Sequence, residues 1–214
     1  CSGLVGSEMC IRDRITAVMA AAIAFVQDDL KKVLAYSTMS QLAYIFTGLG
    51  AALWLANSLD WHHDSKAHDI VVVAFGAALF HLFNHAMAKG MLFMASGSVI
   101  HEMHHAHHDL HHHDDHDDHG DDHHDDHHDD HFDAQSMENM GGLASKMPIT
   151  ATAMLVGSAS IMGLPLIGGF WSKEGIIANT WRVALEDPRF FLPAACVLLG
   201  AAMTGFYMSR MWFK

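Results

Sequence analysis

The stretch IVVVAFGAALFHLFNHAMAKGMLFMASGSVI (residues 70–100) runs for 31 residues with a single charged side chain, Lys89. A helix needs about 20 mostly apolar residues to cross the roughly 30 Å hydrocarbon core of a bilayer. The stretch therefore predicts a membrane-spanning helix that is tilted or that extends beyond the membrane. Its polar residues then lie at membrane depth.

Four further apolar windows predict the remaining spans, at residues 15–26, 33–56, 148–177 and 190–213. The first is short, although it can lengthen into the residues that precede it. The predicted fold is all-α: a polytopic membrane helix bundle of about five transmembrane helices, one of them discontinuous. Basic residues are more frequent in the loops on one side, which favours a cytoplasmic face for the long loop between the third and fourth spans.

The discontinuous helix is predicted in the fourth span, within GLPLIGG (residues 163–169). Proline removes a backbone donor and glycine loosens a helix, so the predicted break residues are Gly163, Pro165, Gly168 and Gly169. Broken helices often mark ion pathways, because unwound backbone at membrane depth must be buried in protein or line a water-filled cavity. We expect Lys173 and Glu174 near such a pathway. The alternative is a lysine at an ordinary helix end with a surface partner.

The charge is concentrated in one tract. The whole chain has a net charge of -12, from 12 basic and 24 acidic residues, but residues 101–133 contain 15 His and 13 acids, so the rest is nearly neutral. Together with a hydrophobic fraction of 51%, this excludes a soluble acidic protein. The three cysteines form no CxxC pair, which argues against a disulfide framework, structural zinc or iron–sulfur ligation.

The predicted organisation has four parts. Residues 1–14 lack the features of a signal peptide and are interpreted as a non-native leader joined to an internal fragment. Residues 15–100 are expected to form three transmembrane helices. Residues 101–136 are predicted to be a disordered His/Asp-rich loop. Residues 137–214 are expected to hold the broken helix and the final span.

His81, His85 and Lys89 are spaced four residues apart, so they share one face of the third span. A lysine near the middle of an apolar span must be paired, hydrated or neutral, because a charge there costs a few kcal/mol or more. Histidine exchanges protons near neutral pH. The stripe predicts a proton relay, the alternative being a lysine that reaches the interface beside histidines that pack between helices.

Polar residues also lie at the start of the second span. Lys31 is either an interfacial anchor or part of the same path, and Ser40 and Gln41 are either helix–helix hydrogen-bonding residues or part of a wet path. The five spans contain no acidic partner for a buried lysine except Glu174. We therefore expect the chain to be part of a larger assembly.

The tract itself offers many possible metal ligands. His and Asp at this density bind zinc, nickel or copper weakly, but no fixed spacing defines a site, so no residue is assigned as a metal ligand. A metal-handling membrane protein that acts through this loop is a remote alternative, since the spans provide only His81 and His85 as ligands.

Four ordered motifs resemble the antiporter-like membrane subunits of respiratory complex I, and most closely its L-type subunit, chain 5 of NADH-quinone oxidoreductase. They are DDLKKVLAYSTMSQLAY (residues 28–44), FHLFNHAMAKGMLFMASGSVIHE (80–102), MENMGGLASKMP (137–148) and GGFWSKEGII (168–177). The resemblance implies that the chain is the second of two inverted five-helix repeats, half of an antiporter-like module. It also implies a central hydrophilic axis for protons formed by Lys31, His81, His85, Lys89 and Lys173.

The resemblance implies a function in proton translocation across an energy-coupling membrane, as a non-redox subunit with no catalytic activity of its own. FMN, iron–sulfur clusters and quinone are expected in other subunits. The expected partners are other membrane subunits, the lipid bilayer and the missing first repeat, and no nucleic acid. The location is a bacterial or archaeal cell membrane, or a mitochondrial inner membrane in a eukaryote. The alternative function is that of a subunit of a multi-subunit cation/proton antiporter.

Overall fold

The computed structural model describes the backbone of residues 4–114 and 133–214, and the side chains of residues 15–108 and 133–214. The described chain is helical, which confirms the all-α prediction. Its α-helices are α1 (Leu4–Val26), α2 (Leu30–Ser58), α3 (Ser65–Asp114), α4 (Leu143–Lys146), α5 (Pro148–Met162), α6 (Gly168–Glu186) and α7 (Phe191–Phe213). Two 3₁₀ turns, Met137–Asn139 and Pro188–Phe190, complete the described elements.

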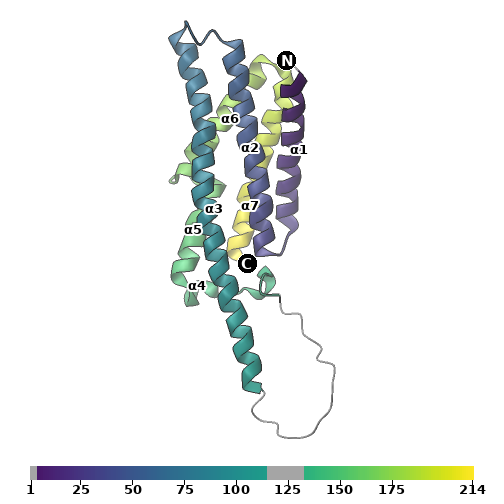
Figure 1. Ribbon diagram of the computed structural model, residues 1–214, viewed down its shortest axis with the longest axis vertical. Coiled ribbons are helices and arrows are strands. Elements are labelled where there is room, and N and C mark those ends of the chain that lie inside the picture. The colour runs from purple at the N-terminus through teal and green to yellow at the C-terminus, as the bar shows by residue number, and fades with distance from the viewer. Residues whose placement is uncertain (1–3, 115–132) are drawn as a thin grey trace.

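The long helices lie side by side (Figure 1). Helix α2 is central and contacts α1, α3, α6 and α7, while α5 packs against α3, α6 and α7. Among the described helices, Leu30–Ser58, Ser65–His108 and Pro188–Phe213 are long and apolar enough to cross a membrane, and Ile15–Val26 and Pro148–Met162 are shorter apolar helices. Large apolar side chains such as Leu53, Phe83 and Met94 are exposed, as expected of a surface that faces lipid.

The third span is longer than predicted. The loop was predicted to begin at residue 101, and this is wrong for residues 101–114, because α3 continues through them to Asp114. No Pro or Gly interrupts this stretch, and adding residues to an existing helix avoids the cost of nucleation. The extension projects beyond the ends of the neighbouring helices (Figure 1). The tract from 115 to 132 lies outside the described residues.

The predicted break in the fourth span is present and includes Gly163 and Pro165, but Gly168 and Gly169 are wrong as break residues, because they are the first two residues of α6. Helix α5 ends at Met162, and Gly163 takes a left-handed conformation with a φ of 86° that suits a residue without a Cβ atom. Helix α6 begins at Gly168 and continues to Glu186, beyond the predicted end at residue 177. The two halves meet closely at Gly169, where a Cβ atom would lie 1.9 Å from the carbonyl oxygen of Ser160.

The turn between α1 and α2 lies at the same end of the bundle as the end of α7 (Figure 1). The Asp29 carboxylate caps α2 by accepting from the backbone N–H groups of Lys31 and Lys32. The Leu30 N–H donates to the Gln135 carbonyl at 3.0 Å, and the chain after the tract is thereby tied to this turn. The basic residues Lys31, Lys32, Arg210 and Lys214 lie at this end of the bundle.

Candidate functional site

Polar side chains are buried between α2, α3, α6 and α7, although each of these helices is largely apolar. They include Gln41, Thr47, His81, His85, Lys89, Ser172, Lys173, Asn179, Thr180 and Thr204. Burying a polar group is costly unless it has a hydrogen-bond partner. The hydrogen-bond partners of these side chains therefore decide which of them can hold or transfer a proton.

The stripe on α3 points into the bundle. His81, His85 and Lys89 are all buried, and the two imidazole rings stack with centroids 6.5 Å apart. The Lys89 ammonium donates to the Leu34 carbonyl of α2 at 3.0 Å. The lysine is only 5% exposed, so the alternative of a side chain that reaches the interface is wrong for Lys89.

Lys173 lies in α6, and its side chain reaches back to the break in the fourth span. Its ammonium donates to the Ile161 carbonyl, in the last turn of α5, at 2.9 Å. The carbonyl end of a helix carries partial negative charge, so this position stabilises a cation without a carboxylate. The ammonium also lies 5.9 Å from the centre of the Tyr44 ring, and the Tyr44 hydroxyl donates to the Lys173 carbonyl at 3.0 Å.

His81 is held at both ring nitrogens. Its Nε2 lies 3.0 Å from Gln41 Oε1, and its Nδ1 lies 2.9 Å from the Ser172 hydroxyl. An amide oxygen can only accept, so in this arrangement Nε2 carries a proton. Neutral His81 then needs a donor at Nδ1, and the Ser172 hydroxyl can provide it. That hydroxyl can donate instead to the Gly169 carbonyl at 3.1 Å, which leaves its oxygen to accept from a protonated His81.

Gln41 connects this group to α7. Its side-chain NH₂ group donates to the Thr204 hydroxyl at 3.0 Å. The amide oxygen of Gln41 is therefore the atom that faces His81. The Tyr207 hydroxyl donates to the Ser37 hydroxyl at 2.9 Å. Hydrogen bonds therefore link four helices through side chains that are buried.

His85 has a different environment. Its Nε2 is buried and has no hydrogen-bond partner among the described residues. The imidazole lines a cavity of about 10 Å³ together with Gln41, His81, Asn84, Ser160, Ile161 and Gly169. A volume of this size is about what one water molecule needs, and a buried imidazole nitrogen is a suitable partner for that water.

Three predicted site residues lie elsewhere. Lys31 is exposed at the start of α2. Glu174 is also exposed, and within the described chain it forms no ion pair with Lys173. Ser40 is buried, but its hydroxyl donates to the Ala17 carbonyl at 3.0 Å and ties α2 to α1. A helix carries adjacent residues on different faces, so neighbours of a buried lysine need not share its environment.

Ser172, Thr204 and Tyr207 were not among the residues predicted from the sequence. Ser172 belongs to the motif that contains Lys173, and a hydroxyl beside a buried lysine was a possible signal. Thr204 and Tyr207 are spaced three residues apart on the final span, which places both on one helix face. Their partners are distant in the chain, so no local pattern identifies them.

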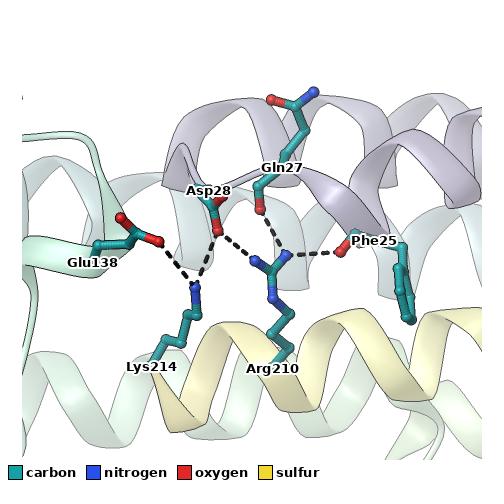
Figure 2. A network of polar contacts seen from close by, with 6 residues as sticks. All are labelled: Phe25, Gln27, Asp28, Glu138, Arg210 and Lys214. Atoms are coloured by element: carbon teal, nitrogen blue, oxygen red, sulfur yellow. Dashed lines mark hydrogen bonds and ion pairs between the residues drawn. The ribbon is translucent and has the colours of Figure 1, made fainter.

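A second polar network closes the end of the bundle where α1 turns into α2 (Figure 2). The Arg210 guanidinium donates to the carbonyls of Phe25 and Gln27 at 2.7 and 2.9 Å and also pairs with the Asp28 carboxylate. Lys214 lies 3.1 Å from Asp28 and 3.8 Å from Glu138. The hydrogen bond from Lys214 and the charges of both cations lower the pKa of Asp28 below its usual 3.8.

The chain is similar to known membrane proteins over most of its length. The model of the transmembrane region of NADH:quinone oxidoreductase and Mrp antiporters matches residues 8–59 and 69–198. The chain is 38% identical over 199 residues to NAD(P)H-quinone oxidoreductase subunit 5, chloroplastic, of Anthoceros angustus, and covers 21% of that protein with 93% of its own length. The same subunit of Glycine max is 36% identical over 198 residues, covering 92% of this chain and 20% of that protein. The chain therefore spans about a fifth of the length of these relatives.

Proposed function

Because this chain belongs to the NADH:quinone oxidoreductase/Mrp antiporter transmembrane family, we propose that it moves protons across the membrane as part of an NAD(P)H-quinone oxidoreductase. The resemblance to the antiporter-like subunits of complex I, inferred from four motifs, is confirmed by these relatives. The proposed path follows the buried groups Lys173, His81, His85 and Lys89.

The observation that carries the proposal is the setting of the two lysines. Lys89 and Lys173 each donate to a helix carbonyl, and in the part of the chain that the structure describes neither has an acidic partner. A lysine held by carbonyl dipoles alone has no fixed counter-ion that locks it in the charged state. Its proton therefore responds to charges that appear nearby, as a proton-loading site requires.

His81 and His85 lie between the lysines along the path. The Ser172 hydroxyl provides a donor for neutral His81 and an acceptor for its protonated form, so one rotation of that hydroxyl accompanies proton uptake. Gln41 keeps the proton on Nε2 of the neutral ring. A water in the cavity beside His85 would bind its Nε2, and Gln41, which lines the same cavity, would connect that water to His81.

The assembly that contains this path is also part of the proposal. Other membrane subunits and the first repeat of the same module would complete it. FMN, iron–sulfur clusters and quinone would belong to other subunits, where electron transfer changes the charge that the lysines sense. A cation/proton antiporter remains the second candidate, because the matching family includes Mrp antiporters, but the named relatives favour the quinone oxidoreductase.

The test is Lys89→Ala in the assembled complex, with quinone reduction and proton uptake measured together in vesicles. We expect fewer protons per electron, because the path loses its end group. The matched control is Lys66→Ala, which removes an exposed lysine of the same helix and should leave the ratio unchanged. An unchanged ratio in Lys89→Ala, with the complex intact, would contradict the proposed path. Sodium-dependent transport without quinone reduction would favour the antiporter.

A further inference from the structure

The extension of α3 arranges histidines that the sequence leaves without defined geometry. His101 and His105 are exposed and lie one turn apart on this helix. Their imidazole rings are in contact, with centroids 4.5 Å apart and planes at 77°. Histidines in this relation can turn one nitrogen each toward a common point beyond the helix surface.

We propose that His101 and His105 form a two-imidazole site for a divalent transition metal ion. Metal–nitrogen bonds are about 2.0–2.1 Å long, so two ligand nitrogens about 3–4 Å apart can share one ion. Rings with centroids 4.5 Å apart reach that separation by rotation of the side chains alone. Imidazole favours copper, nickel and zinc over magnesium or calcium.

The helix is what makes the site specific. In a flexible segment, each imidazole would bind an ion independently, and binding would depend only on the number of histidines. In the helix, the spacing of four residues brings both ligands to one ion, so the ion also closes one helical turn. Among the described residues no group of three or more potential ligands converges, so the proposed site has two ligands within that part of the chain.

Metal binding at this position is expected to stabilise the extension of α3. The extension projects beyond the bundle (Figure 1), and both histidines are exposed. A bound ion stabilises only the conformation that brings both ligands together, here the helix. Metal binding would therefore protect the backbone of this extension, which joins the bundle to the rest of the His/Asp tract. This inference is independent of the proposed proton path.

The experiment uses the full chain in detergent and Cu²⁺ alone as the probe. Because the tract has many other histidines, all of them except His101 and His105 are replaced by Gln in a background variant. Copper affinity and the number of coordinating nitrogens are measured by titration and electron paramagnetic resonance. We expect one ion bound by two nitrogens, with slower hydrogen exchange of the amides of residues 101–108.

The matched control moves one ligand without changing their number. In the same background, His105→Gln with Ala106→His keeps two histidines but separates them by five residues, which places them on different faces of the helix. Losing an outer partner of a metal ligand already costs about 10–100-fold in affinity, so the shifted pair should bind copper at least about tenfold more weakly. Equal affinity of the two variants, or single-nitrogen coordination in the background, would overturn the proposed site.

Discussion

Lys173 donates to the carbonyl of Ile161 across the break between α5 and α6, at 2.9 Å. In an uninterrupted helix this carbonyl would accept from the residue four positions later, which here is Pro165 and has no N–H. The proline therefore leaves an acceptor at membrane depth, and the lysine uses it. The break and the buried cation are two parts of one local structure.

Pro165→Ala should weaken this structure, because it provides an N–H that competes for the Ile161 carbonyl. A hydrogen bond to a charged group contributes about 1.5–3 kcal/mol. We expect proton transport by the assembled complex to fall by about tenfold. The control is Pro188→Ala, which changes an exposed proline outside the polar interior. Equal proton transport in the two variants would show that Pro165 does not contribute to the role of Lys173.

Gly169→Ala should destabilise the chain, since the new Cβ atom would lie 1.9 Å from the Ser160 carbonyl oxygen, where backbone has to move. Overpacking usually costs about 1–3 kcal/mol, and a backbone clash belongs at the upper end of that range. Thermal unfolding in detergent measures the effect. Gly76→Ala is the matched control, because a Cβ atom there meets nothing within 4 Å and its effect should be small.

Ser172→Ala should slow proton transfer without preventing assembly. The variant leaves Nδ1 of protonated His81 buried without its acceptor. This costs about 1–3 kcal/mol whenever His81 carries the second proton. We expect transport to fall by about tenfold or more while the amount of assembled complex is unchanged. Ser172→Thr keeps a hydroxyl and should retain most of the activity. If alanine and threonine behave alike, the hydroxyl has no part in the relay.

The network of Asp28, Arg210 and Lys214 predicts a dependence of stability on pH. The pKa of Asp28 is lowered in the folded chain, so its carboxylate contributes stability that is full above the ordinary value of 3.8 and is lost as the pH falls toward the lowered pKa. Asp28→Asn should therefore reduce thermal stability near neutral pH, and the difference from the unmodified chain should shrink below about pH 4. Asp60→Asn, an exposed change of equal charge, is the control. A difference that persists unchanged in acid would contradict the ionic role of Asp28.

Several features could be predicted because they depend on short stretches of sequence. Apolar length predicted the spans, the proline and glycines of residues 163–169 predicted the break, and spacing along one helix predicted a shared face for His81, His85 and Lys89. The same spacing left open whether Lys31 and Glu174 are buried, and both are exposed. Burial of a helix residue depends on the helices that pack against it.

The sequence by itself determined the membrane helices, the family and the polar stripe of α3, because each depends on composition, motif or helical period. Only the tertiary structure decided which groups form hydrogen bonds with that stripe. Gln41 and Thr204 are 163 residues apart and meet because α2 and α7 pack together. Hydrogen-bond partners of buried groups are set by the packing of helices in space, and the period of a single helix contains no information about its neighbours.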